Sequence, residues 1–251
     1  MTSVARLFNN EVQSGLNYSG VWLPNKRLIA GDVCSARDGQ LQRTSNLHNL
    51  GLSVDVDDLQ GASEIYYETP GAFDISVSGS AGADASAVGA KADGRADLRF
   101  KSDFAVVMRL ENTRGSAVSD LKALERQLLE RFRQGTWDLD DYFVVETLSA
   151  RHSVILVSNN KNASASLGLD LTASKALPVD VRGSLALTTS ISNVKGAAFH
   201  SVSKEEITPL VRLARLVDPW FGKPRVTMKS SGSKSSPMLV TGVDYTADMT
   251  S

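Results

Sequence analysis

The side chains that most often carry out catalysis or bind metals are few and scattered in this sequence. The three histidines, His48, His152 and His200, lie far apart, and none belongs to an HExxH pattern or has a second potential ligand at helical spacing. No glycine-rich phosphate loop and no GxSxG nucleophile motif occurs. We therefore expect structural or surface histidines, and neither a metal nor another cofactor.

The remaining reactive groups lack neighbours that would make them catalytic. Cys34 has no adjacent histidine and no evident helix N-terminus to lower its pKa, so we expect an unreactive residue in a short strand, with a reactive or lipidated thiol as the alternative. The acidic pairs Asp57-Asp58, Asp140-Asp141 and Glu205-Glu206 are adjacent, so their side chains diverge and are expected in turns and caps. The sequence therefore predicts a protein that is not an enzyme.

The composition narrows the possible partners. Lys and Arg together number 27 and Asp and Glu 28, so no overall charge excess favours nucleic acid. The single cysteine excludes an intramolecular disulfide and fits a reducing compartment. The N-terminal stretch lacks the roughly 7- to 15-residue apolar core of a signal peptide, and no run of about 18 apolar residues occurs. We expect a protein that starts out soluble and could enter a membrane only by β-hairpins.

The first of two unusually long alternating stretches occupies residues 73–104, with one change of phase after Val88-Gly89. Successive side chains of a strand point to opposite faces of the sheet, so this pattern predicts a β-hairpin. Its arms exceed the usual strand length of about five or six residues. Its apolar face includes Ala81, Ala83, Ala85, Ala90, Ala92, Ala96, Leu98 and Phe100. The opposite face of the second arm carries Lys91, Asp93, Arg95, Asp97, Arg99 and Lys101.

The second alternating stretch runs from residue 163 to residue 188, with a turn at 175–178. Its apolar face carries Ala163, Ala165, Leu167, Leu169, Leu171, Val181, Leu185 and Leu187. This face of leucine and valine suits hydrocarbon better than the alanine face of the first hairpin. Each arm of the first hairpin keeps its alternation for longer than the roughly 9 to 11 residues that a tilted strand needs to cross a bilayer. The alternative is a half-exposed antiparallel sheet in a soluble protein.

Other segments supply the elements around the hairpins. Apolar residues at helical spacing predict three helices, over residues 3–14, 118–132 and 208–217. The second has Ser116 or Ser119 before it and Gly135 after it. The third has Thr208 as its cap and Pro209 in its first turn. Residues 32–67 predict several short strands. Residues 142–148 and 153–157 predict two core strands joined by a turn at Arg151-His152.

The C-terminal part contains a local basic cluster that the totals hide. From Arg212 to Lys234 it carries six positive charges against Asp218 alone. Such a cluster attracts anionic headgroups, and the residues that we expect to contact them are Arg212, Arg215, Lys223 and Arg225. Residues 229–236, KSSGSKSS, predict a flexible linker, and the apolar residues 237–245 beyond it are expected to dock against a surface.

This order of elements, with the segment YFVVETLSARHSVILV at Tyr142–Val157, resembles the N-terminal pore-forming domain of the gasdermin family, in which a YVVTEVL strand follows the helix between two hairpins. The resemblance in layout covers about residues 15–226. It implies a soluble, autoinhibited α+β protein that proteolysis activates, that binds acidic lipids and that then refolds both hairpins into a large oligomeric β-barrel pore, killing the cell.

The chain resembles the short microbial members of that family, which carry a C-terminal inhibitory peptide. The resemblance implies a pore-forming domain at 1–226 and a linker with inhibitory tail at 227–251, cut by an activating protease around Lys229, Ser230, Gly232 and Lys234. It also implies a defence role, in the cytoplasm when inactive and at the inner membrane when active. One departure is that positions 2–4 are Thr, Ser and Val, whereas short bacterial members often have a lipidated cysteine beside the first methionine.

Together these patterns predict an α+β fold: a twisted antiparallel sheet with flanking helices and two long β-hairpin regions able to form an oligomeric transmembrane β-barrel. The alanine and leucine faces of the hairpins would contact lipid, and the charges from Lys91 to Lys101 would face the aqueous lumen. Open strand edges are costly in lipid, so a homo-oligomer is required. The alternative function is a soluble β-rich scaffold subunit that assembles into a ring or tube without touching membranes.

Overall fold

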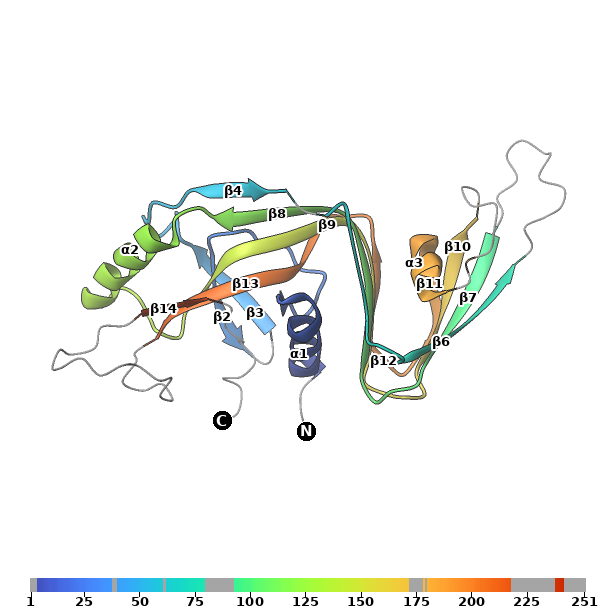
Figure 1. Ribbon diagram of the computed structural model, residues 1–251. Coiled ribbons are helices and arrows are strands. Elements are labelled where there is room, and N and C mark those ends of the chain that lie inside the picture. Colours follow the sequence, from blue (N-terminus) through green and yellow to red (C-terminus); the bar gives the residue numbers. More distant parts are fainter. Residues whose placement is uncertain are drawn as a thin grey trace.

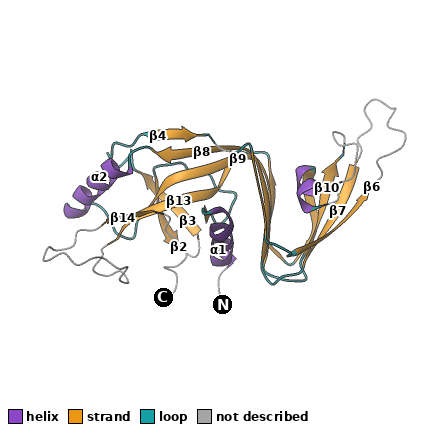
Figure 2. Cartoon of the chain, viewed as in Figure 1, coloured by secondary structure: helices purple, strands orange, loops and turns teal. Residues whose placement is uncertain are grey.

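The computed structural model describes residues 4–37, 40–60, 62–79, 93–171, 178, 180–217 and 238–241. Within them the chain forms a large and a four-stranded antiparallel sheet with three short helices (Figures 1 and 2), so it is mostly β and the α+β expectation holds only in part. The elements are α1 Val4–Leu16, β1 Ser19–Gly20, β2 Asp32–Arg37, β3 Gln40–Asn46, β4 Val56–Leu59, β5 Glu64–Glu68, β6 Phe73–Gly79, β7 Asp93–Phe100, β8 Ala105–Val118, α2 Leu121–Arg133, β9 Tyr142–Ser158, β10 Ser164–Asp170, α3 Val181–Ala186, β11 Thr188–Lys195, β12 Ala197–Ser203, β13 Ile207–Val217 and β14 Met238–Thr241.

Four chain segments run from one sheet into the other. The small sheet has the strand order β11-β10-β7-β6, and the adjoining part of the large sheet has the matching order β12-β9-β8-β5. Each strand of the small sheet is therefore continuous in the chain with the strand in the same place of the large sheet. Figure 1 shows β8 and β9 crossing the upper left of the molecule and then descending in the part labelled β12, after which the chain rises again as β6, β7, β10 and β11.

A bend interrupts all four segments at the same level. It consists of residues 69–72, 101–104, 159–163 and the single residue Gly196. Gly71 and Gly196 adopt φ values of 66° and 68°, a left-handed conformation that glycine tolerates best. Ser102 Oγ donates a hydrogen bond to the carbonyl of Phe104 at 2.7 Å and closes another of the turns. Of the predicted long arms, the described strands are β6, β7 and β10, which are seven or eight residues long and end at this bend.

The predicted alternation is confirmed in β6, β7 and β10. β6 and β7 pair antiparallel from Phe73↔Phe100 to Gly79↔Gly94. In β7 the side chains of Ala96 and Leu98 are buried, whereas Arg95 and Arg99 are exposed. The predicted helices at the N-terminus and at 118–132 are also confirmed as α1 and α2, although the cap of α2 is Asp120, which accepts from the Ala123 amide at 2.8 Å.

The predicted helix over 208–217 is wrong, because this segment is the strand β13. Thr208 is not a cap: it is buried, and its hydroxyl donates to the Leu28 carbonyl at 2.8 Å. β13 lies between β9 on one side and β1 and β14 on the other. Both of its faces are covered, with Val211 and Leu216 fully buried in different apolar clusters. A strand buried on both faces is a continuous apolar run, which helical spacing also fits.

Two further expectations are corrected. The predicted turn at Arg151-His152 lies inside the continuous strand β9, at the point where pairing with β13 ends at Ala150 and pairing with β12 begins at Ser153. The return arm of the second hairpin is not a strand over 179–188 but contains α3. The following segment forms β11 and β12.

Candidate functional site

The bend folds the apolar face of the small sheet against the adjoining part of the large sheet, with α3 between them (Figure 1). The resulting apolar cluster combines β7 and β10 with Val107 of β8, Leu156 of β9 and Leu185 of α3. Most side chains predicted to contact lipid are found here and are at most 3% exposed: Ala96, Leu98, Phe100, Ala163, Ala165, Leu167, Leu169, Leu171 and Leu185. Val181 and Leu187 pack at its margin. Ala81, Ala83, Ala85, Ala90 and Ala92 lie outside the described residues.

The helix α3 is short and poorly suited to stand alone. Its six residues, VRGSLA, include a glycine and a β-branched valine, both of which disfavour helix. Asp180 caps the helix by accepting from the Gly183 amide at 2.8 Å. Thr188 donates its hydroxyl to the Ser184 carbonyl at 2.8 Å beyond the last turn. α3 therefore depends on tertiary contacts, chiefly burial of Leu185.

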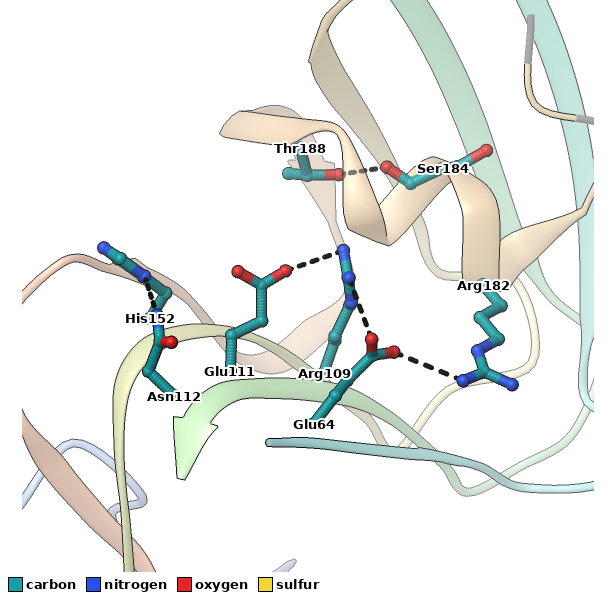
Figure 3. A network of polar contacts seen from close by, with 8 residues as sticks. All are labelled: Glu64, Arg109, Glu111, Asn112, His152, Arg182, Ser184 and Thr188. Atoms are coloured by element: carbon teal, nitrogen blue, oxygen red, sulfur yellow. Dashed lines mark hydrogen bonds and ion pairs between the residues drawn. The ribbon is translucent and has the colours of Figure 1, made fainter. Parts of the chain in front are cut away.

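A chain of charged side chains ties α3 to the large sheet (Figure 3). Arg182 of α3 lies 3.4 Å from Glu64 of β5, and its guanidinium carbon lies 5.5 Å from the centre of the Tyr66 ring. Glu64 also contacts Arg109 of β8 at 3.2 Å, and Arg109 contacts Glu111 at 2.8 Å. Glu64 and Glu111 are directly opposite each other across β5 and β8, so Arg109 and Arg182 offset the repulsion between the two carboxylates.

Sequence reasoning missed this network. Arg109 is a single cation inside the apolar run from Phe104 to Leu110, and its side chain is 13% exposed. A cation in a buried run needs a partner, and this is the signal that could have pointed to a polar contact at this place. Which carboxylates pair with Arg109 depends on the pairing of β5 with β8 and on the position of α3.

The packing around α3 is incomplete. A half-open pocket of about 220 Å³ lies between α3 and the large sheet, bordered by Arg109, Val154, Leu185, Thr188 and Val202. Atoms that line this pocket face solvent in place of side chains, so they make fewer dispersion contacts than they would in a filled core. The region at the bend therefore combines a buried apolar face with a weakly packed helix that ion pairs attach to the large sheet.

We expect acid to weaken the attachment of α3. The hydrogen bond from Arg109 lowers the pKa of Glu64 below its ordinary value, so its stabilising contribution is complete above about pH 4.3, the usual unfolded value, and is lost as pH falls through its folded pKa. The free energy of unfolding, measured by urea titration from neutral pH to pH 3 or so, should fall more steeply for the natural chain than for Glu64→Gln. Glu205→Gln, at an exposed site, should follow the natural chain, and parallel curves for all three proteins would contradict this role of Glu64.

The opposite face of the small sheet is polar. Arg95, Asp97, Arg99 and Lys101, four of the side chains predicted to face a lumen, lie on it. Asp97 accepts from Ser166 Oγ at 2.6 Å and from Arg95, and these contacts lower its pKa, with the Ser166 bond the largest cause. Lys91 and the side chain of Asp93 lie outside the described residues.

Of the basic residues predicted to contact lipid headgroups, Arg212 and Arg215 are described, and both lie on β13, away from the small sheet. Arg212 contacts Glu146 at 2.7 Å and stacks 4.6 Å above the Tyr18 ring. Arg215 donates to the Tyr142 hydroxyl at 3.2 Å. Both arginines are thus engaged within the fold. Lys223, Arg225 and the predicted cleavage residues Lys229, Ser230, Gly232 and Lys234 lie outside the described residues.

The expected docking of the C-terminal tail is seen as an added strand. β14 pairs antiparallel with β13 from Val217↔Met238 to Ala214↔Thr241. This pairing supplies partners to backbone groups on the edge of β13 beyond the short β1 pairing at Leu210 and Val211. The tail therefore completes one edge of the large sheet.

The remaining candidate chemical groups do not form a site in the described part of the chain. Cys34 is fully buried, and burial, the largest cause, raises its pKa to about 12, so the thiol is not activated. The described residues contain no group of three or more histidine, cysteine or carboxylate side chains arranged to hold a metal. Among the described helices, none has the length and apolar content required to cross a bilayer.

A scan against models of protein families found no match to this chain, and a search of curated proteins found no match either.

Proposed function

We propose that this chain is the closed form of a pore-forming protein of the gasdermin type. Proteolytic removal of its C-terminal tail would release it from the cytoplasm into the inner membrane, where copies assemble and lyse the cell. The observation that carries this proposal is the repeated strand order, β12-β9-β8-β5 and β11-β10-β7-β6, across a bend of a few residues. Straightening that bend would join the four strands of the small sheet to the four matching strands of the large sheet as one continuous ribbon, without any change of strand partners.

The distribution of side chains supports the same conversion. The apolar cluster at the bend is built from one face of the small sheet, and the other face bears charges. Straightening would separate the large sheet from the apolar face of the small sheet. That face would then be exposed unless it contacted another apolar surface. Hydrocarbon is such a surface, and the charged face would then line water.

The edges of the small sheet require several copies. Within the described residues β6 and β11 each have one neighbouring strand, so each leaves a row of unpaired backbone groups. Because the sheet has four antiparallel strands, β6 and β11 run in opposite directions, and β6 of one copy can pair antiparallel with β11 of the next. Each unpaired group costs several kcal/mol in lipid, so a closed ring of copies is the form that can insert.

The segment that forms α3 supports a second change of structure. Val181, Leu185 and Leu187 alternate with Arg182, Ser184 and Thr188 as a strand would, although the segment is helical in this form. Its helix is short and capped by one aspartate, so little intrinsic preference opposes a strand. We propose that this segment extends the ribbon of β10 and β11 when the bend straightens.

We expect protein truncated near Lys234, which lacks β14, to release dye from liposomes at micromolar concentration. The full chain should release little, because β14 then occupies the edge of β13. Dye release and the size of membrane-extracted assemblies are the two measurements. Absence of leakage from a truncated protein that remains folded by circular dichroism would overturn the proposal.

The free edges also fit a soluble ring or tube, so the scaffold remains the second candidate. Substituting Leu169 and Leu185 by Asp does not separate the two functions, because both side chains are at most 2% exposed and a buried charge would destabilise the closed form in either case. The two functions are separated by a pair of Leu185 variants that both loosen α3 in the closed form but differ in whether they place a charge in lipid.

A further inference from the structure

The polar face of the small sheet carries an excess of positive charge next to the bend. Two adjoining depressions in this face, of about 350 and 530 Å³, share Arg99 and Ser164 in their walls. Together these walls contain two carboxylates and five cations: Asp74, Asp97, Arg95, Arg99, Lys101, Lys161 and Lys195. The excess is therefore three positive charges, and it is still two when the exposed Asp103 of the bend is counted.

Three of the five cations account for this excess. Asp74 contacts Lys101 at 2.7 Å, and Asp97 contacts Arg95 at 2.9 Å, so the charges of these two pairs cancel. The other three cations are exposed and form no ion pair within the described part of the chain. We call them the cation row: Arg99, Lys161 and Lys195.

The strand register gathers the cation row at one end of the small sheet. Ser164 of β10 is directly opposite Arg99 of β7 on one side and Lys195 of β11 on the other. Asp74 of β6, which is already paired, is opposite Arg99. Lys161 precedes Ser164 by three positions and borders the same depression as Arg99. The positive excess is therefore confined to the few residues of each strand nearest the bend.

The other end of the polar face carries negative charge. Asp170 of β10 is exposed and lies opposite Asp93 of β7 in the strand register. Asp170 follows Ser164 by six positions, which is about 20 Å along a strand. This distance exceeds the Debye length of about 8 Å at physiological salt, so Asp170 does not offset the cation row.

We propose that the pore formed by this chain conducts anions in preference to cations and that the cation row sets this preference. The inference rests on the proposed function, because it concerns the face that lines water in the inserted ring. Straightening the bend leaves the strand partners unchanged, so every copy would hold its cation row at the same level of the ring. A closed ring of copies would then carry a continuous belt of positive charge. Rings of Arg and Lys side chains favour anions in channels, since they attract anions to the wall and repel cations.

The dependence on salt distinguishes this selectivity from selection by size. The Debye length is about 30 Å at roughly 0.01 M salt and about 3 Å at roughly 1 M. The belt of charge should therefore act on much of the lumen in dilute salt, and only on ions beside the wall in concentrated salt. Selection by the diameter of the pore would be the same in both.

The test is the reversal potential of pores in planar bilayers under a gradient of KCl, whose two ions have nearly equal mobility. The full chain carries a protease site introduced between residues 227 and 237 and is cleaved at the membrane, and one fixed lipid composition is used throughout. We expect a severalfold preference for chloride at about 0.01 M salt and almost none at about 1 M.

Two sets of variants assign the preference to the cation row. Replacing all three cations by glutamine should abolish the preference for chloride, and replacing them by glutamate should reverse it to potassium: Arg99→Gln, Lys161→Gln, Lys195→Gln and Arg99→Glu, Lys161→Glu, Lys195→Glu. Circular dichroism checks the fold of each variant before cleavage.

The matched control removes three exposed cations from α2, on the other side of the molecule from the small sheet: Lys122→Gln, Arg126→Gln, Arg133→Gln. This variant has the same net charge as the glutamine variant of the cation row. It should keep the preference for chloride of the unsubstituted chain.

Pores that prefer potassium or neither ion in dilute salt would overturn this inference. An unchanged preference in the glutamine variant of the cation row, or an equal loss in the α2 control, would also overturn it. Pores exist in each of these results, so the proposed function would stand. Absence of any conductance after cleavage of a folded chain would instead refute the proposed function, and this inference with it.

Discussion

A disulfide between positions 217 and 238 is expected to keep the protein inactive after its tail has been cut. Val217 and Met238 are directly opposite in the antiparallel pair of β13 and β14. Cα atoms in such pairs are about 4.5 to 5.5 Å apart, within the range that a disulfide spans. In the double variant Val217→Cys, Met238→Cys, with a protease site introduced between residues 227 and 237, cleavage should leave β14 attached, so dye release from liposomes should begin only when a reductant is added.

This experiment separates pairing of β14 from cleavage itself. The single variant Val217→Cys with the same protease site should release dye on cleavage with or without reductant. Cys34 is fully buried and should not compete for the new thiols. Leakage by the cleaved, oxidised double variant would show that β14 is not the inhibitory element. The expected effect is large, because a covalently held strand remains at a high effective concentration beside its partner.

Two substitutions of Leu185 are expected to have the same effect on the closed form and opposite effects on membranes. Leu185 is 1% exposed in the apolar cluster, and replacing a buried leucine by alanine typically costs about 2 to 5 kcal/mol. Leu185→Ala should therefore loosen α3 and make the truncated protein release dye faster. Leu185→Asp should also loosen α3, but it would place a carboxylate on the lipid face of every copy. Insertion would then cost up to about a few kcal/mol more per copy, so dye release should be abolished.

Ala186→Asp is the matched control. Ala186 is exposed and follows Leu185 directly, so in an extended strand its side chain points to the opposite, aqueous face. This variant carries the same added charge and should release dye like the unsubstituted truncated protein. Limited proteolysis at α3 measures the loosening independently. A scaffold that never touches lipid should lose assembly in both Leu185 variants, and equal leakage from those two would contradict insertion of this face.

The two-residue pattern was enough to identify the faces of the strands. Alternation in β7 and β10 placed Leu98 and Leu167 on one face and Arg95 and Arg99 on the other, and all four are found so. Strand periodicity is a local property, because consecutive side chains alternate whatever the strand packs against. The absence of metal-binding and nucleophile motifs and the helices α1 and α2 were likewise visible in the sequence, because each depends on residues close together in the chain.

Where a segment has two patterns at once, only the tertiary structure decides. Residues 208–217 fit a helix by spacing but lie in β13, since strand partners on both edges and apolar clusters on both faces are available there. Residues 181–186 alternate like a strand but form α3, since Leu185 enters the cluster at the bend and Arg182 reaches Glu64. Packing energies of a few kcal/mol exceed the local preferences of such short segments.

The sequence alone thus determined which side chains share a face in the strands β6, β7 and β10. The tertiary structure decided that these strands and β11 are folded back at a common bend, that α3 is tied down by Glu64 and Arg109, and that β14 covers the edge of β13. The physical reason is distance along the chain. Glu64 contacts Arg182, and Val217 pairs with Met238, because segments that are separate in the sequence pack together, and the local pattern of one segment carries no information about its partner.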